Sequence, residues 1–220
     1  NEIEDDILII FTDCFDVIFN DNGDNIIKKY KKIIDRERKE GRDNYILFST
    51  EVNCWPDLNL SKDYPKVDTK YKYLNSGGFI GYKRDILQLI DTDIDELEDD
   101  QLYYTQQFLE KENIKLDYKC EIFQTLNNSV EDITLNINRS ELVNKYTKTS
   151  PSIIHGNGPS KLNLNLIANY IPNRWSEIYG YMMKDHKFII KDNVNIAIYS
   201  NKINKKNVKY KKSNIIYFTN

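Results

Sequence analysis

The chain has 220 residues, and its 40% hydrophobic and 30% charged residues are enough for one sizeable core, with a second small domain allowed. Its 31 basic and 34 acidic residues give a net charge of −3, so no bulk field favours nucleic acid or a membrane surface as a partner. No apolar run approaches the roughly 20 residues of a membrane-spanning helix. The three cysteines lack the C-x-x-C spacing of common zinc sites and complete no disulfide framework.

The first predicted element is a strand over residues 7–11, whose β-branched apolar residues are typical of a buried strand at the centre of a parallel sheet. Asp13 and Asp16 follow it. A turn over residues 12–15 would bring these acids about 5 to 6 Å apart at Cβ, where both could face one Mg²⁺ or Mn²⁺ ion. The competing interpretation is that Asp13 caps a helix and that Asp16 is a solvated acid of its first turn.

A loop around Gly23, an amphipathic helix over residues 26–38 and a strand over residues 44–50 predict a right-handed βαβ unit with a parallel sheet. The polar stretch 49–57 then lies at the carboxyl end of a strand, where open α/β sheets bind ligands. Within it, Trp55 either stacks on a sugar ring or a base, or packs as a lid on its own core.

Residues 73–82, YLNSGGFIGY, read as a strand, and their glycines do not match the G-x-G-x-x-G dinucleotide pattern. Such glycine density indicates either the close approach of a ligand or another backbone, or a bulge without function. A short helix over residues 84–91 follows, and then an acidic run leads into a helix that reaches Leu109. Asp99 and Asp100 at its start either face solvent near the positive helix end or face a cleft and bind a sugar hydroxyl.

A strand over residues 114–123, a polar turn over residues 124–128 and an alternating strand from residue 133 indicate a mixed sheet. In the stretch PSIIHGNGPSK, a short strand opens into a Gly-rich turn at His155, six residues before Lys161. A neutral imidazole is a common metal ligand, and the turn with its lysine suits phosphate. Alternatively, His155 is a core histidine beside a structural turn. A helix over residues 162–175 follows, and the basic strands after residue 182 are expected to protect a sheet edge.

Six stretches of this chain resemble, in order, the glycosyltransferase domain of the procollagen lysyl hydroxylase and collagen glucosyltransferase family, with a viral or protist member expected. They are FTDCFDVIF, LFSTEVNCWPD, YLNSGGFIGY, DDQLYYTQQFL, IFQTLNNSVEDI and HGNGPSKLNLNLIANYIPNRW. The resemblance implies an α/β fold of GT-A type, a Rossmann-like mixed sheet flanked by helices, over residues 1–180, followed by a strand-rich basic extension over residues 181–220. It also implies Mn²⁺, rather than Mg²⁺, and UDP-glucose as the donor.

The implied reaction transfers glucose, with retention, to galactosyl-hydroxylysine of collagen or a collagen-like peptide. Matched to the family's motifs, the metal ligands are Asp13, Asp16 and His155. The nucleotide and diphosphate contacts are Phe15, where the family has tyrosine, together with Asn157, Gly158 and Lys161. The positions around the donor sugar and the acceptor are Trp55, Asn75, Asp99 and Asp100.

The sequence departs from the family in three places. The acidic run before Gln101 reads ELEDD and contains fewer aspartates than in the family, so the family's roles are carried over only to Asp99 and Asp100. Leu58 replaces a second tryptophan, which removes one stacking contact. Few residues precede Asp13, so we expect the N-terminal uracil-binding part of the domain to lie outside this chain. Two alternatives stay open: a hydroxylysine galactosyltransferase that uses UDP-galactose, and an inactive collagen-binding or scaffolding module. The resemblance places such proteins in the endoplasmic reticulum lumen, a viral member in the host cytoplasm or virion, and admits a homodimer.

Overall fold

The computed structural model describes residues 7–37, 45–91, 99–136 and 141–168, and the backbone of five short strands between residues 181 and 218. The chain divides into two compact units, Asn1–Tyr170 and Ile171–Asn220. Among the described residues, no helix is long and apolar enough to cross a membrane. His186, the predicted helix beyond residue 168 and most of the basic stretch 202–212 lie outside the described residues.

The described residues of the second unit are strands. Strand β10 (Tyr181–Lys184) pairs antiparallel with β11 (Lys187–Ile190), which pairs parallel with β13 (Val208–Tyr210). Strands β12 (Ile196–Tyr199) and β14 (Ile215–Phe218) form a separate parallel pair.

A four-stranded mixed sheet is the centre of the first unit, with the order β1 (Leu8–Thr12), β4 (Tyr73–Tyr82), β3 (Ile46–Glu51) and β5 (Ile114–Leu116). Strand β4 runs antiparallel to β1 and β3, and β3 runs parallel to β5. The predicted mixed α/β class is therefore confirmed. The prediction that the first two strands are adjacent in a parallel sheet is wrong, because β4 lies between β1 and β3. Strand β1 is also not a buried central strand but the edge of this sheet, with Phe11 44% exposed.

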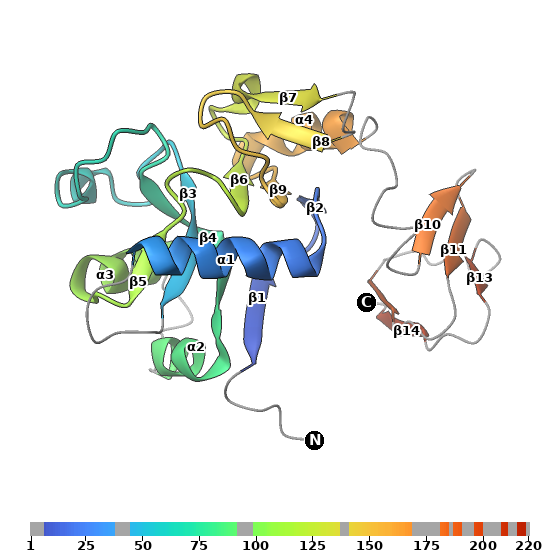
Figure 1. Ribbon diagram of the computed structural model, residues 1–220, viewed down its shortest axis with the longest axis horizontal. Coiled ribbons are helices and arrows are strands. Elements are labelled where there is room, and N and C mark those ends of the chain that lie inside the picture. Colours follow the sequence, from blue (N-terminus) through green and yellow to red (C-terminus); the bar gives the residue numbers. More distant parts are fainter. Residues whose placement is uncertain are drawn as a thin grey trace. The chain divides into compact units, whose positions relative to one another are not determined.

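Helices cover both faces of this sheet (Figure 1). Alternate residues of a strand point to opposite faces, so Leu47 packs with α1 (Gly23–Glu37) on one side and Phe48 packs with α2 (Lys83–Ile90) and α3 (Asp100–Glu110) on the other. Helix α1 begins at Gly23, earlier than predicted, because the Asn22 side chain accepts the Asn25 backbone N–H at 2.9 Å and so caps the helix.

A smaller sheet with the order β2 (Val17–Phe19), β9 (Ile153–His155) and β6 (Phe123–Thr125) adjoins the main one. The predicted alternating strand from residue 133 is confirmed as β7 (Ile133–Asn136), paired antiparallel with β8 (Glu141–Asn144). The other bounded elements are α4 (Lys161–Ala168) and the 3₁₀ turns Leu58–Lys62, Val130–Asp132 and Gly158–Ser160. The strand pattern predicted within residues 114–123 forms β5 at Ile114–Leu116 only, because the chain turns after Leu116 and begins β6 at Phe123.

Asp117 holds that turn. Its buried carboxylate accepts the backbone N–H groups of Glu121 at 2.9 Å, Ile122 at 2.7 Å and Phe123 at 2.9 Å. We expect Asp117→Ala to lower the free energy of unfolding by about 3 kcal/mol or more, because a buried donor without a partner costs about 1–3 kcal/mol. Urea unfolding measures the loss. Asp117→Asn keeps one acceptor oxygen, so an Asn variant as unstable as the Ala variant would contradict this account.

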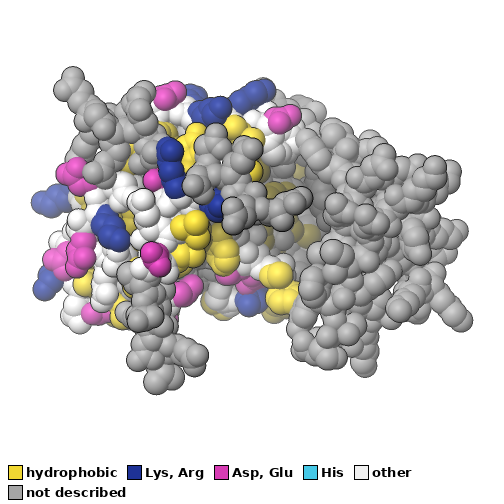
Figure 2. Space-filling model, turned by 90° about the horizontal axis from the view of Figure 1, so that it is seen from below, with side chains coloured by type: hydrophobic (Ala, Val, Ile, Leu, Met, Phe, Trp, Pro, Cys, Tyr) yellow, Lys and Arg dark blue, Asp and Glu magenta, His cyan; other side chains and the backbone are white. Residues whose placement is uncertain are grey.

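Charged side chains of both signs are interspersed on the face of the first unit seen in Figure 2. This distribution agrees with the net charge of −3 and shows no broad basic area on that face that would suit a nucleic-acid backbone.

Candidate active site

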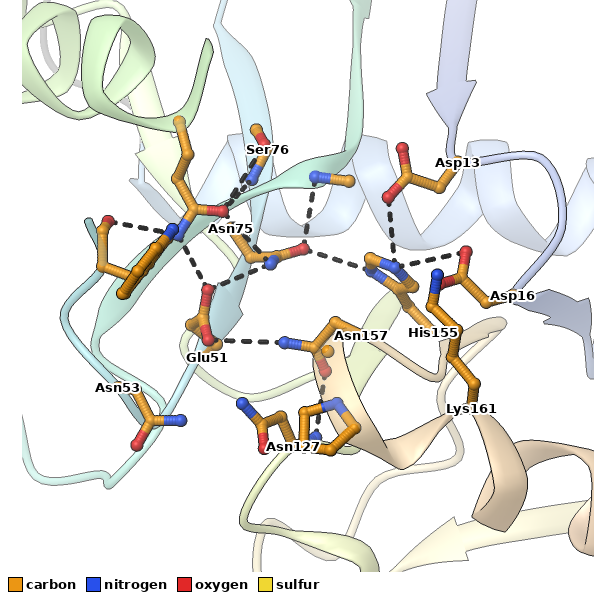
Figure 3. A pocket seen from close by; sticks show the side chains of 15 residues that line it. Asp13, Asp16, Glu51, Asn53, Asn75, Ser76, Asn127, His155, Asn157 and Lys161 are labelled. Atoms are coloured by element: carbon orange, nitrogen blue, oxygen red, sulfur yellow. Dashed lines mark hydrogen bonds and ion pairs between the residues drawn. The ribbon is translucent and has the colours of Figure 1, made fainter. Parts of the chain in front are cut away.

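Three predicted metal ligands come together where three strands end or begin. Asp13 follows β1, Asp16 precedes β2 and His155 ends β9, and Figure 3 shows their side chains pointing toward one another. The chain between β1 and β2 bends, as the metal interpretation requires, so Asp13 caps no helix. The Asp13 N–H donates to the Gly77 carbonyl at 3.0 Å, and the Gly156 N–H donates to the Asp16 carbonyl at 2.8 Å.

The distances suit a shared cation. His155 Nε2 lies 3.2 Å from Asp13 Oδ2 and 3.7 Å from Asp16 Oδ1, and one ligand atom from each of the three residues lies within 4.8 Å of the others. Burial lowers the pKa of His155, while the two carboxylates oppose that shift. A neutral imidazole with two carboxylates is a nitrogen and oxygen donor set that fits Mn²⁺.

Lys161 stands beside the three ligands. Its ammonium lies 3.1 Å from Asp16 Oδ2, the oxygen that faces away from His155, and its side chain is 62% exposed. Lys161 therefore orients the Asp16 carboxylate, and its exposed ammonium group can still bind a second anion.

The three ligands lie at one side of a pocket of about 560 Å³. Of the residues predicted for the site, those that line it are Asp13, Asp16, Trp55, Asn75, His155, Asn157, Gly158 and Lys161. The other three, Phe15, Asp99 and Asp100, do not line it. Phe15 is 74% exposed. The Asp99 side chain accepts the Leu102 N–H at 3.1 Å and so caps α3, as the helix-end interpretation expects.

The middle of the pocket, which no sequence motif predicted, is a buried carboxylate surrounded by amides. Glu51 Oε1 accepts from Asn75 at 3.0 Å and from Gln101 at 2.8 Å, and Glu51 Oε2 accepts from Asn157 at 3.3 Å. Burial raises the pKa of Glu51, and these hydrogen bonds oppose the shift. The signal in the sequence was an acid at the end of a predicted strand, four residues before Trp55.

Two further amide side chains line the pocket, those of Asn53 and Asn127. Amides both donate and accept hydrogen bonds, so a wall rich in them suits a ligand with many hydroxyl groups. Trp55 lies at the rim with 60% of its surface exposed, and its backbone carbonyl accepts from Gln101 at 3.2 Å. Its indole face is thus available for stacking on a sugar ring.

The glycines of β4 make the convergence possible. Phe48 pairs with Phe79 but Ser49 pairs with Asn75, so the segment 76–78 bulges out of its pairing with β3. A Cβ at Gly77 would lie 2.2 Å from His155 Cε1 and 2.7 Å from Asp13 Oδ2. The groups that approach Gly77 closely are thus neither a ligand nor another backbone, as predicted, but the side chains of two predicted metal ligands, Asp13 and His155.

Comparison with known proteins gives a family and several relatives. The family model described as "PLOD GT domain" matches residues 1–181. "Uncharacterized protein R699" of Acanthamoeba polyphaga mimivirus is 42% identical over 168 residues, which is 76% of this chain and 35% of that protein. Human "Multifunctional procollagen lysine hydroxylase and glycosyltransferase LH3" is 38% identical over 180 residues, 78% of this chain and 23% of that protein.

A third relative is human "Procollagen-lysine,2-oxoglutarate 5-dioxygenase 2", 37% identical over 185 residues, which is 80% of this chain and 24% of that protein. The chain thus spans between 23% and 35% of the length of these three relatives.

Proposed function

We propose a glycosyl-transfer function, and its premise is that this chain belongs to the PLOD GT domain family. That membership confirms the expected resemblance and agrees with the GT-A type of fold. The proposed reaction is the Mn²⁺-dependent transfer of glucose, with retention, from UDP-glucose to galactosyl-hydroxylysine of collagen or a collagen-like protein. The observation that carries it is the convergence of Asp13, Asp16 and His155 beside an amide-lined pocket.

The charged residues of the site would act on the diphosphate of the donor. Asp13, Asp16 and His155 would hold Mn²⁺, which when bound supplies a Lewis acid for the charge that develops on the leaving diphosphate. Lys161 already lies 3.1 Å from Asp16 and is largely exposed, so it can add a point charge on the same phosphate oxygens. The Gly158 turn beside it lets the backbone approach them.

The uncharged residues would bind and orient the sugar. Asn53 and Asn127 offer both donors and acceptors to hexose hydroxyls from the pocket wall, whereas the Asn157 amide already bonds within the protein. Trp55 at the rim can stack on a sugar face and keep water away from the reacting carbon.

The acceptor is assigned to the α3 side of the pocket. Asp99 is engaged as a helix cap, whereas the Asp100 carboxylate lies 3.4 Å from the Ser76 hydroxyl, which itself lines the pocket. Of the two acids, Asp100 is therefore the one we propose to orient the acceptor hydroxyl. Asp100→Asn should lower turnover with the peptide acceptor more than it lowers UDP-glucose hydrolysis.

Product analysis tests the reaction directly. The chain is incubated with Mn²⁺, with UDP-glucose or UDP-galactose, and with collagen peptides that carry either free or galactosylated hydroxylysine. We expect glucosyl transfer to the galactosylated peptide alone. Transfer of galactose to free hydroxylysine would replace this reaction with the galactosyltransferase alternative, and peptide binding without UDP release would select the inactive module.

Nucleotide binding should depend on the metal. Two carboxylates against one lysine leave the cluster of Asp13, Asp16, His155 and Lys161 with one excess negative charge, which repels a diphosphate. A divalent ion reverses that excess to positive. We expect UDP to bind at least about 100-fold more weakly in EDTA than in Mn²⁺, as measured by calorimetry. Equal affinity in both buffers would contradict a diphosphate position at this cluster.

A further inference from the structure

The Asn75 side chain lies within hydrogen-bond distance of one ring nitrogen of His155. The Gly77 backbone N–H lies 3.2 Å from Asn75 Oδ1, and a backbone N–H can only donate, so this atom is the amide oxygen. The same oxygen lies 3.2 Å from His155 Nδ1. An oxygen that already accepts from Gly77 carries no hydrogen to give, so Nδ1 must be the donor.

The other end of Asn75 is fixed as well. Its nitrogen donates to Glu51 Oε1 at 3.0 Å and to Gln101 Oε1 at 3.3 Å. Gln101 is oriented in turn, because its oxygen accepts the Ser76 backbone N–H at 3.2 Å and its nitrogen donates to Glu51 at 2.8 Å. A flipped Asn75 would place its oxygen against the Glu51 carboxylate. Its side chain would then lose its bonds to Gly77, Glu51 and Gln101.

We propose that Asn75 is a positioning residue that holds His155 as the Nδ1–H tautomer and leaves its Nε2 lone pair for a cation, with Glu51 and Gln101 locking the amide. This replaces a direct sugar contact as the role of Asn75. The consequence is visible in Figure 3, where Nε2 and the carboxylates of Asp13 and Asp16 face one another. Three acceptors at this separation suit a cation that lies among them.

This inference rests on the metal of the proposed function, so its first test measures Mn²⁺ affinity and not activity. Partners that orient a ligating histidine typically account for 10- to 100-fold in metal affinity. We expect Asn75→Ala to weaken Mn²⁺ binding by about 10- to 100-fold in calorimetry without nucleotide. The double variant Glu51→Gln/Asn75→Asp should restore Mn²⁺ affinity. A carboxylate at position 75 again accepts from His155 Nδ1, and an amide at position 51 can donate to that carboxylate.

Asn144→Ala is the matched control. Asn144 is an equally buried asparagine whose side chain donates to Tyr71 and Gln124, and it does not line the pocket. We expect its Mn²⁺ affinity to equal that of the unchanged chain. A loss as large as that of Asn75→Ala would mean that removing any buried amide loosens the fold, and it would overturn the positioning role.

The second test reads the tautomer directly in the metal-free chain. Because the chain has two histidines, His186→Gln leaves a single imidazole, and ¹⁵N correlation spectra then report the protonation of each ring nitrogen. We expect the proton on Nδ1, and in Asn75→Ala a shift to Nε2, which can then donate to Asp13.

The outcomes separate this inference from the function. A proton on Nε2 in the unchanged site, or equal Mn²⁺ affinity with and without Asn75, overturns the inference and leaves glycosyl transfer standing. Failure of the unchanged chain to bind Mn²⁺ overturns the proposed function. The tautomer spectra still decide the role of Asn75 in that case, because they need no metal.

Discussion

His155→Ala and Asp16→Asn are each expected to lower turnover of UDP-glucose by about a thousandfold or more. The stabilisation of the leaving diphosphate is worth several kcal/mol when a metal supplies it, and each substitution removes one of three protein ligands. Asp16 has a second role, because Lys161 pairs with its other carboxylate oxygen. The Asn variant therefore also releases the lysine that we place on the phosphate.

UDP release and Mn²⁺ affinity measure the effect on the same preparations. His186→Ala serves as the histidine control, and Asp24→Asn, an exposed acid in the first turn of α1, serves as the acid control. Both controls should keep turnover within about twofold, since Asp24 is exposed and neither residue belongs to the proposed metal cluster. Unchanged turnover in His155→Ala with normal folding would remove the metal cluster from the mechanism.

Gly77→Ala should abolish metal binding at the site although it changes no charged group, because the added methyl group would displace the His155 side chain. The added methyl would lie 2.2 Å from His155 Cε1 and 2.7 Å from Nδ1 of the same ring. These distances are far below van der Waals contact, so the imidazole must leave its position and its bond to Asn75. We expect Mn²⁺ affinity and turnover to fall by at least about 100-fold, since a displaced ligand is lost altogether.

Gly23→Ala is the matched substitution, because a Cβ there would meet no atom within 4 Å. It should leave metal affinity unchanged. Circular dichroism and thermal unfolding show whether Gly77→Ala still folds. Normal metal affinity in a folded Gly77→Ala variant would mean that His155 is not held where the structure has it, and the proposed cluster would fail with it.

The residues proposed as metal ligands were predictable because their signals are local. Asp13 and Asp16 follow directly on an apolar strand, so the bend that brings both acids together can be predicted from a short window. His155 likewise ends a strand that opens into a Gly-rich turn. What brings them together is the pairing of β2 with β9, which joins segments far apart in the chain, and only the resemblance to a family predicted that meeting.

The strand order and the middle of the pocket were not predictable in the same way. The position of β4 between β1 and β3 depends on long-range pairing, which leaves no mark in either strand's own pattern. The roles of Glu51 and Gln101 follow only from their contacts with each other and with Asn75. From the sequence, an isolated glutamine at the start of an amphipathic helix is interpreted as solvent-exposed. Asp117 was overlooked because apolar residues on both sides of it resemble one continuous strand.

The pairing of β2 with β9 would also link the stability of the fold to the proposed ion. Asp16 and His155 belong to opposite ends of the first unit's sequence, and an unfolded chain would have to close a very long loop to present them together. A cation that binds only the folded state, in which the ligands are assembled, therefore raises the free energy of unfolding. The increase is about 2.7 kcal/mol at a free concentration one hundred times the dissociation constant. The melting temperature of this protein should thus rise steadily with the manganese supply.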